Sequence, residues 1–88
     1  MLKSTITVTN KSGLHARTAA KLVSTTTAFD CSIELGTAEK MVDAKSILSI
    51  MLLAASEGSV LDIILDGSDE DEALKAIQDL VDNRFGED

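Results

Sequence analysis

The sequence predicts an α+β fold, an open-faced β-sandwich in which three helices cover one face of a four-stranded antiparallel sheet. Segments of alternating apolar and polar residues, typical of half-buried strands, are interspersed with segments whose apolar residues recur at helical spacing. They follow one another in the order βαββαβα, and strands with one apolar face are typical of antiparallel sheets covered on one side. With 88 residues, the chain is expected to form one domain over 1–88.

A short polar loop separates the first predicted strand from the first predicted helix. Residues 2–9 alternate between apolar and polar side chains, which predicts a half-buried strand. Residues 10–13 have the composition of a loop. From residue 16 the apolar period becomes helical, and a helix is expected over about 16–28. Its apolar positions are Ala19, Leu22, Val23, Thr26 and Phe29.

Two more strands and a short helix are expected in the middle of the chain. Residues 30–35 alternate, with the odd-numbered ones apolar, and predict the second strand. Gly36 is expected to mark the turn into a short third strand over 39–43. Ser46 is a favoured N-cap residue and predicts a short helix over 47–53.

The last strand and the last helix have clear signals. Residues 61–66 alternate and predict the fourth strand. Ser68 is the expected N-cap of the last helix, and the acidic run 69–72 lies where it complements the positive end of the helix dipole. Gly86 is expected just past the end of that helix. The apolar face of the helix comprises Ala73, Ile77, Leu80, Val81 and Phe85.

Composition excludes several classes of function. The net charge is −7 and both aromatic residues are Phe, so neither a basic surface nor a stacking platform supports a nucleic-acid partner. The longest apolar stretch, 47–55, is far shorter than the roughly 20 residues that span a bilayer, so no membrane insertion is expected. Cys31 is the only cysteine. No intrachain disulfide, metal site or cofactor is therefore expected, and we predict a cytoplasmic monomer.

The segment 13–20 carries the chemistry. It places the only histidine, His15, directly before a helix, where unpaired N–H groups and the helix dipole disfavour an imidazolium ion and favour a neutral nucleophile. The same N–H groups, in a loop that includes Ala16 and Thr18, can bind phosphate oxygens. Arg17 can add charge-assisted hydrogen bonds. The pattern predicts a histidine that takes up a phosphoryl group and passes it on.

These residues also support a resemblance. Gly-Leu-His-Ala-Arg at 13–17, Ala-Lys-Ser-Ile at 44–47 and the βαββαβα order resemble the HPr family, the histidine-containing phosphocarriers of the bacterial phosphotransferase system. The resemblance implies that His15 is phosphorylated on Nδ1 by Enzyme I, using phosphoenolpyruvate, and then donates to IIA domains of sugar permeases. It implies a carrier that transfers phosphoryl groups with partner proteins and is not an enzyme in its own right. Thr18 departs from the family, in which proline is usual.

Ser46 has two roles to weigh. As the N-cap of the short helix it has a structural reason to be serine. The resemblance adds regulatory phosphorylation, because in some bacteria an HPr kinase/phosphorylase modifies this serine. A phosphate at a helix N-terminus is compatible with the fold and would add negative charge to the partner-facing surface. Both roles stay open on the sequence.

The short helix is also the expected docking surface. A helix of this length cannot bury apolar residues all round, and two are expected to point to the core: Ile50 and Leu53. An exposed apolar face is expected from Ile47, Leu48 and Met51. The resemblance implies that this face contacts Enzyme I and IIA partners. A polar rim is expected from Lys21 and Lys45.

Two other functions remain open. A regulatory phosphocarrier of the nitrogen branch would use the same chemistry on His15 with a different output. A non-phosphorylated adaptor would bind through the short helix alone, although the presence of His15 counts against it. The sequence does not specify the sugars, because their recognition belongs to the permeases.

Overall fold

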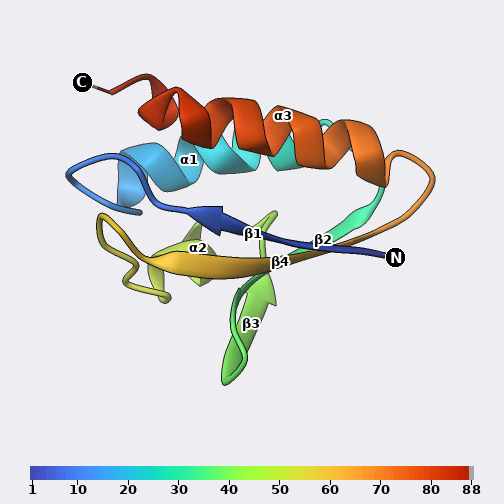
Figure 1. The fold of residues 1–88 in the computed structure, drawn as a ribbon, viewed down its shortest axis with the longest axis horizontal. Coiled ribbons are helices and arrows are strands. Elements are labelled where there is room, and N and C mark those ends of the chain that lie inside the picture. The colour runs from blue at the N-terminus through green and yellow to red at the C-terminus, as the bar shows by residue number, and fades with distance from the viewer. Residues whose placement is uncertain (88) are drawn as a thin grey trace.

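Four strands form one sheet, in which every neighbouring pair is antiparallel and the spatial order is β1-β4-β2-β3. The computed structural model describes residues 1–87 (Figure 1). Its strands are β1 (Leu2–Thr7), β2 (Ser32–Thr37), β3 (Lys40–Asp43) and β4 (Val60–Asp66). Its helices are α1 (Ala16–Thr26), α2 (Ile47–Met51), α3 (Glu70–Asp82) and a 3₁₀ turn, η1 (Arg84–Gly86).

The register of the sheet puts the alternating apolar residues on one face. Ile6 of β1 lies opposite Leu61 of β4, and Ile63 lies opposite Leu35 of β2. All four side chains are at most 3% exposed. The alternation in the sequence therefore identified the core-facing side of each central strand correctly, because residues two apart on a strand share one face.

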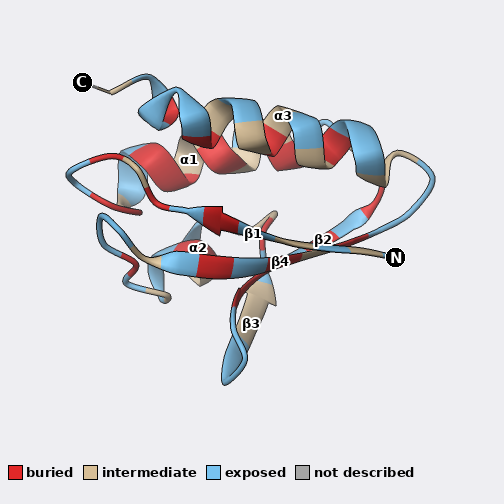
Figure 2. Cartoon of the chain, in the orientation of Figure 1, coloured by how far each residue is buried: buried red, intermediate tan, exposed pale blue. Residues whose placement is uncertain are grey.

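The helices cover that apolar face. Helix α1 packs against both α2 and α3, and Figure 2 shows the buried sides of α1 and α3 turned toward the sheet. Each helix contributes a side chain with no exposed area: Ala19 from α1, Ile50 from α2 and Ile77 from α3. The predicted fold class, a four-stranded antiparallel open sheet with three helices, is confirmed.

Gly36 does not mark the turn that the sequence predicted. It lies inside β2, paired with Met41 of β3 and Asp62 of β4, and the turn follows at residues 38–39. A Cβ atom at this position would stand 2.0 Å from the carbonyl oxygen of Lys40. Glycine is present because the neighbouring backbone approaches closely. Glycine is also common in turns, and the sequence alone does not distinguish the two situations.

The last helix differs from its prediction at both ends. Asp69, and not Ser68, occupies the N-cap position, and its side chain makes no capping bond. The helix ends at Asp82, so Phe85 does not lie on its apolar face. Phe85 is instead part of η1, where its φ of 55° turns the chain back and its ring is 1% exposed. Burial of the ring, and not helical periodicity, accounts for the apolar residue at 85.

No helix within residues 1–87 is long and apolar enough to cross a membrane.

The core role of α2 leads to a stability prediction. Ile50→Ala removes a fully buried side chain and should lower the free energy of unfolding by about 2–5 kcal/mol. Leu48→Ala, on the same helix but 69% exposed, should change it by less than about 0.5 kcal/mol. Urea denaturation of the two variants measures the difference. Equal losses would contradict the assignment of Ile50 to the core.

The Asp69 carboxylate predicts a pH dependence. It accepts hydrogen bonds from the backbone N–H groups of Asp30 (2.8 Å) and Cys31 (2.9 Å), and the bond from Asp30 chiefly lowers the pKa of this carboxyl. A lowered pKa in the folded state stabilises the fold above the unfolded pKa of about 3.9, and this stabilisation is lost as the pH falls through the folded value.

The test is Asp69→Asn. Its unfolding free energy should fall furthest below that of the wild type at about pH 6 and approach it as the pH falls through the lowered pKa of the wild-type carboxyl, which then becomes protonated as well. Asp62→Asn, at an exposed position on β4, controls for the loss of one negative charge. A pH-independent difference between Asp69→Asn and the wild type would contradict the prediction.

Candidate functional site

The loop before α1 is fixed against the segment that follows α2. The N–H of Leu14 donates to the carbonyl of Ala55 at 2.9 Å. Gly13 has a φ of +70°, and a Cβ atom there would lie 2.4 Å from that same carbonyl oxygen. Only glycine therefore allows this approach. The contact sets the position of the next residue in the chain, His15.

His15 is the N-cap of α1, with extended backbone angles. Its Nδ1 atom accepts a hydrogen bond from the Arg17 N–H at 3.3 Å. A nitrogen that accepts a hydrogen bond carries no proton, so the neutral ring carries its proton on Nε2. The imidazole is 33% exposed. The structure thus presents a partly accessible histidine whose Nδ1 lone pair faces the helix N-terminus.

Thr18 supports the loop from beneath. Its side chain is fully buried; the hydroxyl accepts the N–H of His15 at 3.0 Å and donates to the carbonyl of Gly13 at 2.8 Å. The hydroxyl is therefore committed to the backbone of the loop and is not free for a ligand. It restrains the first helical turn by hydrogen bonds, whereas proline does so through its ring. Ala16, the other predicted loop residue, is exposed at the start of α1.

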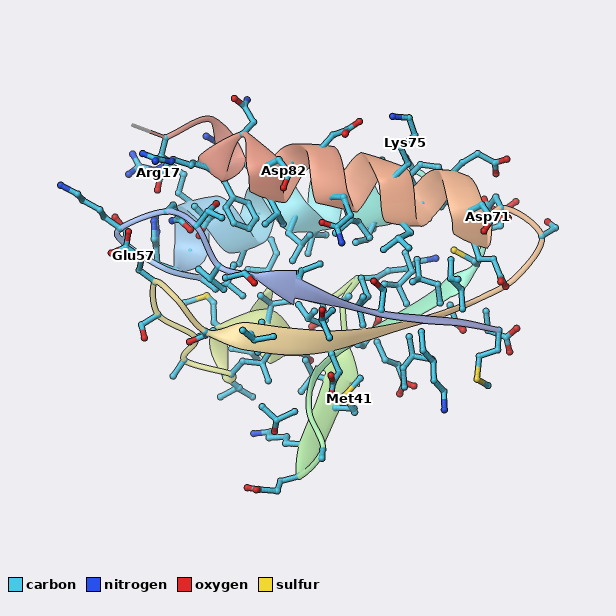
Figure 3. All side chains as sticks on the ribbon, in the orientation of Figure 1. Arg17, Met41, Glu57, Asp71, Lys75 and Asp82 are labelled. Atoms are coloured by element: carbon cyan, nitrogen blue, oxygen red, sulfur yellow. The ribbon has the colours of Figure 1, made fainter. Side chains whose placement is uncertain are left out.

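Arg17 is paired with a carboxylate that the sequence analysis did not single out. Its Nε and Nη2 atoms each lie 3.0 Å from Oε2 of Glu87, and Figure 3 shows Arg17 beside the returning C-terminal tail. Oε1 of Glu87 accepts a hydrogen bond of 2.9 Å from the amide of Asn10, a side chain that is 1% exposed. Residues separated by 70 to 77 positions meet here, and no local spacing in the sequence could have indicated it.

The surroundings of Glu87 favour its charged form. The hydrogen bond from Asn10 lowers the pKa of the Glu87 carboxyl most, burial opposes this, and the positive charge of Arg17 together with His15 lowers the pKa further. The side chain is 14% exposed. A carboxylate is therefore held, ionised, at the edge of the histidine site.

The C-terminal turn is anchored independently of Arg17. The ammonium of Lys21 donates to the carbonyl of Phe85 at 2.8 Å, and the ring of Phe85 is buried. Arg84 and Phe85 both have positive φ, a conformation that is costly for residues with a side chain and that the buried ring offsets. Lys21, predicted as part of a docking rim, thus ties α1 to the tail.

Helix α2 has an exposed apolar surface close to α1. We define the α2 patch as Ile47, Leu48, Met51 and Leu52, which are 39–69% exposed. The first three were predicted to lie outward. Leu52 was not assigned to either side. It follows the last residue of α2 with helical backbone angles and lies four residues after Leu48, so both side chains fall on the same outer face. Leu53, by contrast, packs against the core as predicted.

Ser46 and Lys45 hold the start of α2 in place. The hydroxyl of Ser46 accepts the Ser49 N–H at 3.3 Å, so the predicted N-cap is confirmed. Lys45 donates its ammonium to the carbonyl of Phe29 at 2.7 Å and its backbone N–H to Asp43 at 2.9 Å. The ammonium of Lys45 is therefore directed toward the backbone that follows the end of α1.

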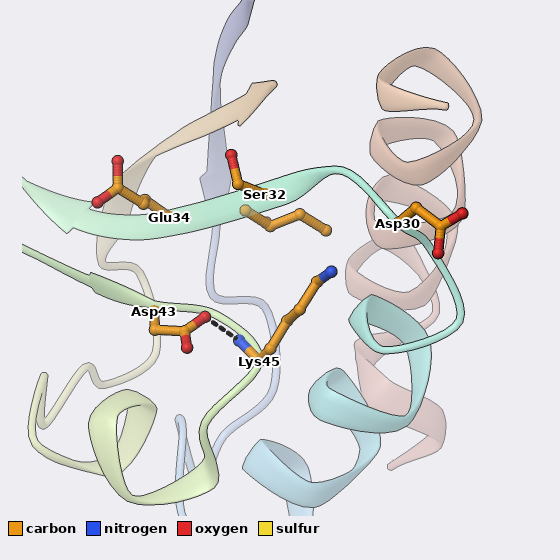
Figure 4. Close-up of a pocket in the computed structure, with 6 residues that line it drawn as sticks. Asp30, Ser32, Glu34, Asp43 and Lys45 are labelled. Atoms are coloured by element: carbon orange, nitrogen blue, oxygen red, sulfur yellow. Dashed lines mark hydrogen bonds between the residues drawn. The ribbon is translucent and has the colours of Figure 1, made fainter. Parts of the chain in front are cut away.

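A cavity of about 580 Å³ lies elsewhere, at the exposed ends of β2 and β3 (Figure 4). Its walls are formed by Asp30, Ser32, Ile33, Glu34, Asp43 and Lys45. It contains neither His15 nor Arg17. Among residues 1–87, no group of three His, Cys, Asp or Glu side chains is arranged to hold a metal ion.

Comparisons with known proteins agree with this geometry. The family described as "PTS HPr component phosphorylation site" matches residues 2–83. The phosphocarrier protein HPr of Xylella fastidiosa strain Temecula1 is 51% identical over 88 residues, covering 100% of this chain and 99% of that protein. The crystal structure of HPr-C-His from Thermoanaerobacter tengcongensis has a TM-score of 0.94 at 45% identity and covers 100% of this chain and 99% of its own.

One related structure bears on assembly. The HPr dimer from Thermoanaerobacter tengcongensis is 46% identical, with a TM-score of 0.78, covering 99% of this chain and 100% of that one. The monomeric state expected for the present chain thus stays a prediction. The fold, the histidine at the start of α1 and the relatives agree on one conclusion: this chain belongs to the HPr family of phosphocarriers of the bacterial phosphotransferase system.

Proposed function

We propose that this chain accepts a phosphoryl group on Nδ1 of His15 from phospho-Enzyme I and donates it to IIA domains of the phosphotransferase system. The observation that carries the proposal is the contact between Nδ1 and the Arg17 N–H at 3.3 Å. It leaves Nδ1 unprotonated, as a nucleophile must be. It also aims that nitrogen at the N-terminus of α1, where phosphate is bound well.

In the transfer, the Nδ1 lone pair of His15 attacks phosphorus while the bond from phosphorus to the donor breaks. The N–H groups of the first turn, from Ala16 to Thr18, then face the phosphoryl oxygens, and the helix dipole favours their negative charge. Contact with an exposed helix end leaves the group accessible to the next acceptor. Most of the catalytic power comes from the partner proteins, and no cofactor is required.

Arg17 changes partners during this cycle. Its side chain is 69% exposed and is held by Glu87 in the unphosphorylated chain. A phosphoryl dianion on His15 offers the guanidinium more charge and a bidentate contact. Arg17 then stabilises the phosphoryl group, as the sequence motif led us to expect.

Partners dock on the α2 patch. Its exposed side chains belong to α2 and its C-cap, and α2 packs against α1. An exposed apolar surface of this kind is typical of protein contacts. Lys21 and Lys45, expected from the sequence as a polar rim, direct their ammonium groups to the backbone carbonyls of Phe85 and Phe29. Enzyme I and the IIA domains would thus share one surface beside the histidine.

Regulation and pathway complete the proposal. Ser46 caps α2, and a phosphate added there by an HPr kinase/phosphorylase would place charge next to the α2 patch and weaken docking. The nitrogen branch is the alternative pathway, with the same chemistry on His15. Phosphorylation rates measured with a sugar-type and with a nitrogen-type Enzyme I distinguish the two pathways, since the chain should be phosphorylated faster by the Enzyme I of its own pathway.

The first prediction concerns the acceptor. After incubation with Enzyme I, Mg²⁺ and phosphoenolpyruvate, intact-mass spectrometry should find one acid-labile phosphoryl group on the wild type and none on His15→Ala. The variant removes the nucleophile, whereas the α1 cap can be taken over by water or a neighbouring group. An adduct of equal yield on His15→Ala would exclude His15 as the acceptor.

A second prediction concerns docking. Leu48→Asp, at an exposed position of the α2 patch, should raise the KM of Enzyme I for this chain by about tenfold or more, since a central apolar contact is worth at least ~1.4 kcal/mol. Val60→Asp places the same charge at a 61% exposed position on β4 and is the control. Equal KM values for the two variants would argue against docking on α2.

A further inference from the structure

The Glu87 carboxylate is the meeting point of three side chains of the histidine site. Asn10 donates to Oε1 at 2.9 Å, and Arg17 donates to Oε2 at 3.0 Å. The third is His15, whose Nε2 lies 3.5 Å from the same Oε2. Acidic side chains are rarely buried unless they are paired, and the Glu87 side chain is only 14% exposed. Glu87 is thus held in place by specific contacts, and His15 is among the residues that it approaches.

The Nε2 atom of His15 needs a partner. It is buried from solvent, and within residues 1–87 no atom makes a hydrogen bond of acceptable geometry with it. Because Nδ1 accepts the Arg17 N–H, the proton of the neutral ring is on Nε2. A buried N–H without an acceptor destabilises the fold, because it loses its hydrogen bonds to water without replacement. The carboxylate 3.5 Å away is an acceptor that a small rotation of either side chain brings into hydrogen-bond range.

We propose that Glu87 is a positioning residue for His15: its carboxylate accepts the Nε2–H and so selects the tautomer whose Nδ1 lone pair is the nucleophile. The significance for phosphoryl transfer rests on the function proposed above. The placement of Glu87 does not depend on Arg17, since Lys21 and the buried ring of Phe85 hold the tail by themselves. Arg17 can therefore leave for a phosphoryl group while Glu87 stays at His15.

The carboxylate has a second effect on the same atom during transfer. When Nδ1 forms its bond to phosphorus and the bond from phosphorus to the donor breaks, the ring keeps its Nε2 proton and becomes cationic. Glu87 faces that positive charge at close range and stabilises it. The charged groups described at this site are Glu87 from the tail and Arg17 from α1, and Asn10, which also bonds to Glu87, is neutral. A cationic ring is also the better leaving group when the phosphoryl group moves on.

The test is made first on the unphosphorylated protein. In ¹⁵N-labelled protein at about pH 9, where a histidine of ordinary pKa is neutral, two-bond ¹H–¹⁵N correlations show which ring nitrogen carries the proton. The wild type should have it on Nε2, and Glu87→Ala should show a several-fold larger Nδ1–H population. Glu87→Asp, which keeps the charge on a shorter side chain, should restore part of the preference. Glu39→Ala, at an exposed turn position, is the matched control.

The same variants then enter the phosphorylation assay. Glu87→Ala should lower kcat for phosphorylation by Enzyme I in proportion to the lost Nε2–H population, with KM unchanged because the α2 patch is intact. An unaltered tautomer ratio in Glu87→Ala would overturn the inference, whatever the kinetics. Failure of the wild type to take up any phosphoryl group would instead refute the proposed function, while the tautomer measurement would still decide the role of Glu87.

Discussion

The hydrogen bond between Leu14 and the carbonyl of Ala55 is the constraint on which the site depends. It joins the loop before α1 to the segment after α2, and the missing side chain of Gly13 makes the approach sterically possible. Because His15 follows Leu14 and α2 ends four residues before Ala55, this contact, together with the packing of α1 on α2, sets the distance between His15 and the α2 patch. A partner that docks on the patch therefore meets a histidine whose place is already set.

The groups around His15 are suited to a negative charge that the unphosphorylated chain lacks. The N-terminus of α1 and the guanidinium of Arg17 are suited to a phosphoryl dianion, and in the unphosphorylated chain the Glu87 carboxylate pairs with the same guanidinium. A carrier must bind its cargo firmly enough to protect it and weakly enough to release it. In the proposed cycle, a carboxylate of the chain that competes for Arg17 would limit how tightly the phosphoryl group is held, since Glu87 lies within reach of the guanidinium.

Much of this could be predicted from local sequence. Alternation identified the buried faces of β1, β2 and β4, because adjacent side chains of a strand point to opposite faces. Ser46 indicated the cap of α2. The place of His15 directly before an amphipathic helix indicated a candidate nucleophile, whereas its role as the N-cap of α1 was not predicted. Gly36 was assigned to a turn, because the sequence does not distinguish a glycine in a turn from one that permits close backbone approach. Phe85 was assigned to α3, because a buried apolar residue can belong to a helix or to the turn that follows it.

The sequence by itself thus determined the fold class, the position of the candidate phosphoryl acceptor before α1 and the exposed apolar character of α2, since each rests on interactions between residues a few positions apart. Tertiary structure alone decided that a distant carboxylate, Glu87, lies beside His15. Asn10, Arg17 and Glu87 meet because the chain reverses at Phe85 and returns to the start of α1. Contacts between residues so far apart in sequence depend on how whole elements pack, and no local pattern of residue types specifies them.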